Sequence, residues 1–177
     1  MKKNKIITII PFKESLNPKK AGAVSLFATD SKKYSKFKEN IKIFSSEKDN
    51  KFFRNKNYIL DFCKKNKNKK IDIIEIHNRP EYVKYIKNYF PKTKIILFFH
   101  NDPETLRGSE YITDRENLLN ICNKIIFISR WIQRKFFTGF VNSNYLDTEI
   151  IHHGVEIPKK TNFNKDKNIL FVGKLNE

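Results

Sequence analysis

Short apolar segments alternate with longer amphipathic ones along the whole chain, and this alternation is what most restricts the possible folds. Seven segments rich in Ile and Phe have the length of strands: residues 5–10, 41–44, 71–76, 94–99, 124–128, 149–152 and 168–172. Helical patterns lie between them, over residues 21–37, 52–65, 81–90, 113–122 and 130–137. This order predicts an α/β fold with a Rossmann-like, doubly wound, mostly parallel sheet and helices on both faces.

Local patterns predict where some of these helices begin and which side faces the core. Thr113 and Glu116 have the spacing of a capping box, and Ser129 is a good N-cap residue directly before the helix 130–137. Near the end of the first helical segment, Tyr34 and Phe37 continue the apolar spacing of a core-facing stripe. We therefore expect both rings to be packed against the sheet.

The same pattern divides the chain into three unequal parts. Residues 1–157 suit a single domain that is long enough to bury a core, and residues 158–167 are polar and without apolar periodicity, as in a linker. The strand 168–172, followed by Gly-Lys, is typical of a strand that opens a domain. We expect residues 168–177 to be the beginning of a second domain.

Charge restricts the possible partners. The formal net charge is +17, mostly from Lys. A single lysine run such as residues 64–70 is adequately explained as a solvated helix end. The total nevertheless favours anionic partners: nucleotide sugars, acidic glycolipids or an anionic membrane face.

Location in the cell is predicted from the cysteines and the first residues. Cys63 and Cys122 lie on apolar helix faces and have neither metal-ligand nor disulfide-framework spacing, which indicates reduced core thiols in the cytoplasm. Residues 1–11 have too short an apolar run for a signal peptide, and no stretch is long enough to span a bilayer.

Polar residues follow the predicted strands at their carboxyl ends, where ligands bind in sheets of this kind. The loop after 71–76 has His77 and Asn78, and the loop after 94–99 has His100, Asn101 and Asp102. We expect these two loops to converge. Each histidine taken alone is compatible with a structural role as well as a functional one.

Several enzyme classes lack support in the sequence. There is no Gly-x-Gly-x-x-Gly fingerprint, no P-loop, no Gly-x-Ser-x-Gly elbow and no Asp-x-Asp pair, and the histidines lack zinc-site spacing. These absences argue against a dehydrogenase, a P-loop phosphotransferase and a hydrolase with a covalent nucleophile.

Motifs that occur in order along the chain resemble the N-terminal half of a retaining glycosyltransferase of the GT-B fold, family four. The first four are Ala21-Gly22-Ala23, the strand 72–78, the strand ending 98–102 and the strand 124–129. The most specific pair is Glu-Ile-Ile-His-His-Gly-Val-Glu at 149–156, followed by Asn-Ile-Leu-Phe-Val-Gly-Lys-Leu at 168–175. The His-Asn-Asp-Pro stretch at 100–103 is similar to transferases that build lipopolysaccharide core or other envelope sugars.

This resemblance implies two facing Rossmann-like domains, with the nucleotide-sugar donor held mainly by the second and a glycan or glycolipid acceptor mainly by the first. It implies transfer with retention through an oxocarbenium-like state, without a metal or other cofactor. It also implies a cytoplasmic enzyme, with peripheral contact to the inner face of an anionic membrane as a further expectation.

The resemblance also implies roles for individual residues. His100 is the expected catalytic residue beside the transferred sugar, and Gly22, Gly173 and Lys174 are expected at the donor diphosphate. The remaining candidates, for acceptor binding or for shaping the loops, are His77, Asn78, Asn101, Asp102, Arg107, Ser129, His153 and Gly154. Lys174 stands where the family has arginine and His153 where it has asparagine. The family's Lys-Gly and its later pair of glutamates do not occur within the 177 residues, so this chain alone is expected to be inactive.

Two other functions remain open from the residues. Aromatic residues among lysines, as in Tyr34–Phe37 and residues 52–56, suit a nucleic-acid-binding domain, although no RRM, KH or zinc-finger signature accompanies them. No specific nucleic acid is therefore expected. The basic helices also suit a non-catalytic scaffold that docks on a membrane or on a partner transferase.

Overall fold

Six parallel strands form one sheet in the computed structural model, which describes residues 5–45, 55–141 and 147–154. They are β1 (Ile6–Ile9), β2 (Ile41–Phe44), β3 (Ile73–His77), β4 (Lys94–Phe99), β5 (Lys124–Phe127) and β6 (Thr148–Ile150). Their order across the sheet is β2-β1-β3-β4-β5-β6. The predicted Rossmann-like α/β class is thereby confirmed, whereas the strand predicted at 168–172 lies outside the described residues.

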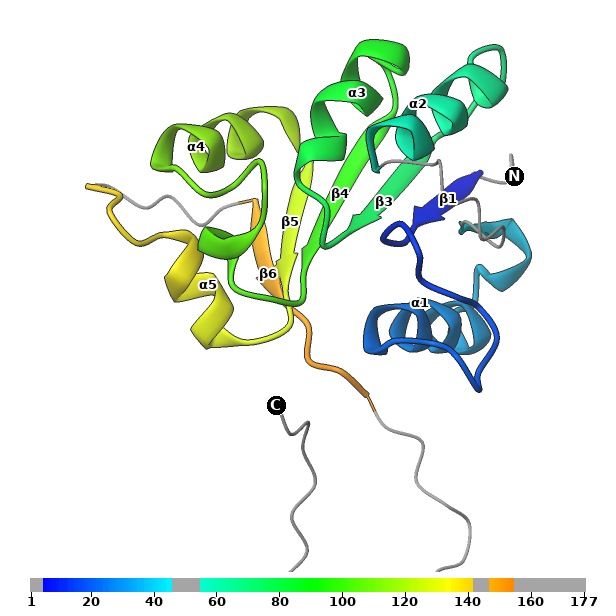
Figure 1. Ribbon diagram of the computed structural model, residues 1–177, viewed down its shortest axis with the longest axis horizontal. Helices are drawn as coiled ribbons and strands as arrows, with labels where there is room; N and C mark the ends of the chain where they lie inside the picture. The colour runs from blue at the N-terminus through cyan, green and yellow to red at the C-terminus, as the bar shows by residue number, and fades with distance from the viewer. Residues whose placement is uncertain (1–4, 46–54, 142–146, 155–177) are drawn as a thin grey trace, which may run out of the picture.

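Helices cover both faces of this sheet, as predicted. The described residues form α1 (Ala23–Tyr34), α2 (Asn55–Asn66), α3 (Glu81–Tyr89), α4 (Ile112–Ile121) and α5 (Arg130–Phe136), with short 3-10 turns η1 (Lys38–Asn40) and η2 (Pro103–Thr105). Figure 1 shows α2, α3 and α4 along one side of the sheet and α1 on the other. None of the helices in this part of the chain is long and apolar enough to cross a membrane.

The two faces of the sheet contact different helices, because successive strand residues point to opposite sides. Ile74, Ile76, Leu97 and Phe99 pack with residues of α2 to α5 in one buried cluster. Each such side chain contributes roughly 1.5–3 kcal/mol by leaving water. The intervening residues face α1, and among them His77 and Phe98 both contact the ring of Phe27.

One predicted helix start is confirmed and another is wrong. Ser129 is the N-cap of α5 and accepts a hydrogen bond from the Ile132 N–H. Thr113, in contrast, lies inside α4, which begins at Ile112, and Asp114 accepts from the Tyr111 N–H in place of the predicted Glu116 bond. Arg115 in this helix is buried, and its guanidinium donates to three backbone carbonyls, those of Ser109, Glu110 and Thr138.

The expected burial of Tyr34 and Phe37 is also wrong. Their exposed fractions are 60% and 50%, and the ammonium groups of Lys33 and Lys36 lie over their rings. Helix α1 ends at Tyr34, so Phe37 lies beyond the helix and does not continue its apolar stripe. Cys63 and Cys122 are buried and free, as predicted, and burial raises the pKa of each thiol to about 12.

The face that packs against α1 holds a carboxyl group at mid-sheet. Glu75 lies beside Thr8 in the β1–β3 register, and the Thr8 hydroxyl donates to its carboxylate at 2.6 Å. Burial raises the pKa of Glu75, and the Thr8 bond opposes that shift. The stability that comes from protonated Glu75 is therefore present below its unfolded pKa and is lost as pH rises through the folded one.

We predict that Glu75→Gln is more stable than the native chain at pH 7, because the amide keeps an acceptor for Thr8 without a buried charge. The difference in melting temperature should shrink towards pH 4, where Glu75 in the native protein becomes neutral. Glu149→Gln, at an exposed position on β6, is the matched control and should change little at either pH. An advantage of Glu75→Gln that is equal at both pH values would contradict this account.

Candidate functional site

The carboxyl ends of β1, β3 and β4 meet at the place where strand order reverses. The chain leaves β1 towards β2 on one side, and β3 then pairs with β1 on the other side. Loops from adjacent strands diverge at such a switch point and leave a crevice, which is the usual ligand position in open α/β sheets. The loops after β1, β3 and β4 are therefore the first place to look for a site.

Three imidazoles form a continuous hydrogen-bonded chain at this edge. Nδ1 of His77 lies 2.9 Å from Nε2 of His100, and Nδ1 of His100 lies 3.0 Å from Nε2 of His153. These residues come from the end of β3, the loop after β4 and the segment after β6. Both ring nitrogens of His100 are thus engaged by other histidines.

Aromatic packing and burial change steadily along this histidine chain. His77 is only 1% exposed and stacks on Phe98 at 4.4 Å, His100 is 8% exposed, and His153 is exposed and stacks on Phe27 at 4.5 Å. Burial lowers the pKa of His77 well below its usual range and that of His100 to about 3. Burial also lowers the pKa of His153. His77 and His100 are therefore neutral at physiological pH.

Asn78 connects the two polar loops, which converge as the sequence predicts. Its side-chain oxygen accepts from the backbone N–H groups of His100 and Asn101, at 3.1 and 3.2 Å. Its own N–H donates to the Phe98 carbonyl. The backbone of Asn78 is left-handed, with φ of 56°, a conformation that Asn adopts more readily than most residues. The chain therefore turns sharply at Asn78, and the Asn78 side chain reaches the loop after the neighbouring strand β4.

The predicted phosphate position at Gly22 holds a carboxylate of the chain itself. Glu14, from the loop after β1, accepts hydrogen bonds from the Gly22 N–H at 3.2 Å and from the Ser25 hydroxyl. A Cβ atom at position 22 would lie 2.6 Å from both carboxylate oxygens, so a larger residue there would displace the end of the flexible Glu14 side chain. An anion does sit at the start of α1, as the electrostatics of a helix N-terminus favour.

The other predicted residues lie around this centre or away from it. Asp102 accepts from the Glu104 N–H in η2 and lies 3.8 Å from the Lys135 ammonium, while Ser129 caps α5. Gly154 and His153 line a surface hollow of about 720 Å³ against α1, next to Phe27. Gly173 and Lys174 are outside the described residues.

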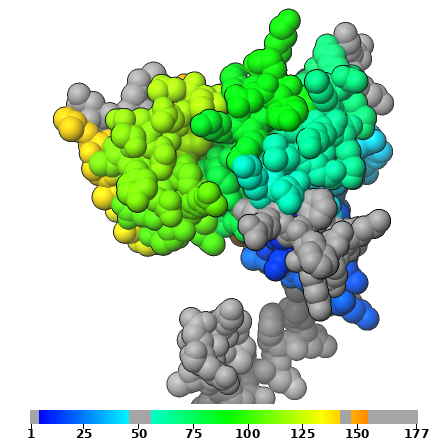
Figure 2. All heavy atoms as spheres, turned by 45° about the horizontal axis from the view of Figure 1, so that its top comes forward, coloured from blue at the N-terminus to red at the C-terminus, as the bar shows by residue number. Residues whose placement is uncertain are grey.

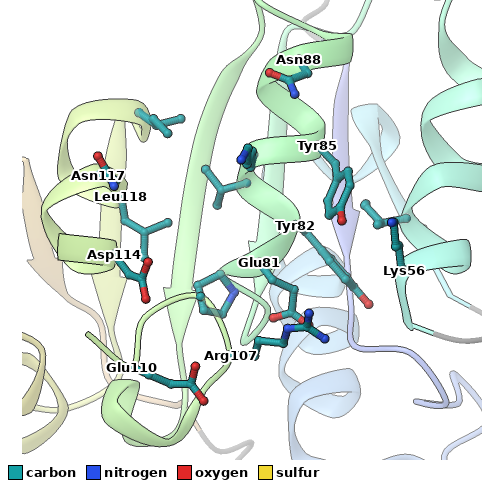
Figure 3. A pocket seen from close by; sticks show the side chains of 16 residues that line it. Lys56, Glu81, Tyr82, Tyr85, Asn88, Arg107, Glu110, Asp114, Asn117 and Leu118 are labelled. Atoms are coloured by element: carbon teal, nitrogen blue, oxygen red, sulfur yellow. The ribbon is translucent and has the colours of Figure 1, made fainter. Parts of the chain in front are cut away.

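Arg107 lies on the opposite face of the sheet from the histidines. It lines a depression of about 730 Å³ formed by residues of α2, α3, α4 and the loop before α4. Figure 2 shows α3 between α2 and α4 on this face, and Figure 3 shows Arg107 and Glu81 towards one end of the depression. Acidic and basic side chains both line it, among them Glu110, Asp114 and Lys56, so it does not form a concentrated anion site.

The histidine chain is not arranged as a metal site. Its nitrogens point at one another in pairs instead of converging on one point. Within residues 5–45, 55–141 and 147–154, no group of three or more His, Cys, Asp and Glu side chains is placed to hold a metal ion.

Comparisons with known proteins point to one fold. The sequence matches no protein-family model and no curated protein sequence. The structure resembles crystal structures of Anabaena Alr3699/HepE solved with UDP, with UDP and glucose, and with UDP-glucose. For the first two, the TM-scores are 0.53 and 0.52 at 15% and 14% identity, and the matches cover 86% of this chain. The matched region spans less than half of the HepE chain, 44% of it in the first structure and 45% in the second.

Sequence reasoning found the three histidines but missed how they are connected. Phe27, within the predicted helical segment 21–37, contacts all three imidazoles. The period-two spacing of Phe98 and His100 was the available signal for their shared face. The sequence has no comparable signal for His153, because it follows the edge strand β6.

We predict that Asn78→Ala destabilises the fold by about 2–4 kcal/mol, because it removes two hydrogen bonds and forces Ala into a left-handed conformation. Asn78→Gly loses the same bonds without the steric cost, so it should be about 1 kcal/mol less destabilised. Denaturant unfolding measures both values. Asn101→Ala is the control, because Asn101 is exposed and bonds to Asn78 through its backbone N–H, which Ala retains. This variant should lower the free energy of unfolding only slightly. Equal losses for Ala and Gly would show that the backbone is not strained.

Proposed function

We propose that the chain is the acceptor-side half of a retaining glycosyltransferase, which transfers a sugar from a nucleotide-sugar donor to a glycan or glycolipid of the cell envelope. The observation that carries the proposal is the His77–His100–His153 chain at the carboxyl edge of β3 and β4. It places a neutral, buried imidazole, His100, directly beneath the exposed His153. The resemblance to HepE, a protein solved with UDP-glucose, supports a nucleotide sugar as donor.

The proposed chemistry requires hydrogen bonds and positive charge, but no protein nucleophile. The glycosidic bond to the diphosphate breaks as the acceptor hydroxyl attacks on the same face, through an oxocarbenium-like state. His100 holds the transferred sugar in place, and helix N-termini and cationic side chains stabilise the leaving diphosphate without a metal. Asn101, Asp102 and Arg107 remain proposals for loop or acceptor contacts.

The donor side of the site is proposed to lie in a second domain that begins at residues 168–177, with Gly173 and Lys174 at the diphosphate. Reading the encoding DNA beyond the codon for Glu177 tests this proposal. We predict Lys-Gly shortly after Leu175 and, further on, two glutamates eight residues apart. A stop codon directly after Glu177 would contradict the two-domain proposal.

For a protein that carries both domains, we predict that His100→Ala lowers sugar transfer by at least about 100-fold. The loss of stability should be modest, about 1–3 kcal/mol, because two imidazole hydrogen bonds disappear. Transfer is followed by release of the nucleoside diphosphate from UDP-sugars, and stability by thermal unfolding. The matched control is His152→Ala, since His152 lies beside the histidine chain but contacts the Ile128 carbonyl instead.

Activity that falls only in proportion to the fraction unfolded would contradict the catalytic role of His100. Binding to anionic vesicles without any binding of nucleotide sugar would instead favour the docking scaffold, for which Tyr34 and Phe37 are exposed beside lysines. Salt-sensitive binding to random RNA that excludes nucleotide sugar would favour a nucleic-acid-binding domain.

A further inference from the structure

We propose that His77 is a positioning residue that fixes the proton of His100 on Nδ1, so that His100 acts as a hydrogen-bond donor towards the crevice. This inference rests on the proposed function for the identity of the ligand, but not for the state of the imidazoles. The argument starts from one atom, Nε2 of His77, at the buried end of the histidine chain.

Nε2 of His77 is buried and has no hydrogen-bond partner among the described residues. A buried N–H group without an acceptor is among the rarest features of folded proteins, because its lost hydration is not replaced. A bare ring nitrogen, which only lacks a donor, is the less costly alternative. Neutral His77 therefore keeps its proton on Nδ1, the nitrogen that faces His100.

The remaining tautomers follow from this first one. Because His77 Nδ1–H donates, Nε2 of His100 must accept and carries no proton. Neutral His100 then has its proton on Nδ1 and donates to Nε2 of His153, 3.0 Å away. Each imidazole of the histidine chain thus donates towards the protein surface, from buried His77 through His100 to exposed His153.

Neutral forms are favoured at both inner positions, since burial lowers the pKa of His77 and of His100. The stacked ring of Phe98 at 4.4 Å and the ring of Phe27 leave His77 in apolar surroundings. A second proton on either imidazole would be a buried charge, which such surroundings disfavour. In the part of the protein that the structure describes, the donor-to-acceptor direction of the three imidazoles is therefore set by the lack of an acceptor at Nε2 of His77 rather than by a carboxylate partner.

This polarity determines what kind of ligand atom His100 recognises. His153 is exposed, and its Nε2 occupies the acceptor position for the outward Nδ1–H of His100. A ligand that engages His100 must take the place of His153 and must itself offer an acceptor, such as a sugar hydroxyl oxygen. Nε2 of His100 remains occupied by His77 throughout, so the ring cannot turn to offer its other nitrogen.

Long-range ¹H–¹⁵N NMR spectra of the 177-residue chain test the proposal directly, because protonated and bare imidazole nitrogens have separate shifts. We expect His77 and His100 to carry their protons on Nδ1 at neutral pH. In His153→Ala, whose changed side chain is exposed, His100 should keep this tautomer. His152→Ala is the matched control and should leave the spectra of the other three histidines unchanged.

A proton on Nε2 of His100 in the native chain would overturn the proposal. So would loss of the Nδ1–H tautomer in His153→Ala, because His153 rather than His77 would then set it. The NMR spectra need no substrate, so they test the tautomers independently of sugar transfer. If the spectra show the predicted tautomers but the two-domain protein transfers no sugar, only the proposed function is contradicted.

In a protein that transfers sugar, His77→Phe should lower kcat by about fivefold to tenfold with little change in KM, because His100 loses its ordering bond. His77→Gln, whose amide can donate to Nε2, should restore most of that loss. A fall in melting temperature for both variants without any change in kcat would mean that His77 is only structural.

Discussion

The register between β3 and β4 is the constraint on which the site depends. It pairs His77 with Phe98, and alternation then puts His100, two residues beyond Phe98, on the same face of the sheet. A shift of one residue would turn His100 into the core cluster and Phe99 towards α1. The buried apolar residues that prevent such a shift, among them Ile74 and Leu97, therefore also fix the distance between the imidazoles.

Two polar side chains, Asn78 and Arg115, stabilise loops by bonding to backbone groups. Asn78 holds the loop after β4 by two N–H groups, and Arg115 bonds to the Ser109 carbonyl in the loop before α4 and to the Thr138 carbonyl after α5. Neither interaction pairs two charges. Because loop backbone has no ladder partners, such bonds give these segments a definite shape at the edge where ligands bind.

The sequence allowed a good prediction of the elements and a partial prediction of the site. The six strands within the described residues and the Ser129 cap follow from local periodicity and chemistry, which neighbouring residues determine. The capping box predicted at Thr113 failed because Asp114 caps the Tyr111 N–H and α4 begins at Ile112. The burial predicted for Tyr34 failed because α1 ends at this residue and Lys33, not the core, lies over its ring. The contact between His100 and His153 depends on six strands being in register, and no local pattern encodes it.

At the start of α1, the Glu14 carboxylate and the proposed donor phosphate would use the same hydrogen-bond donors. The Glu14 carboxylate already takes the Gly22 N–H and the Ser25 hydroxyl, the groups that a donor phosphate would need there. A phosphate at Gly22 therefore requires Glu14 to leave, and two anions at one helix end would repel each other otherwise. Since Glu14 is in a loop and its carboxylate bonds to Gly22 and Ser25 at the start of α1, a move of this side chain leaves the β1–β3 ladder intact. The proposed donor position thus depends on moving one loop carboxylate, whereas the His100 position depends on the sheet itself.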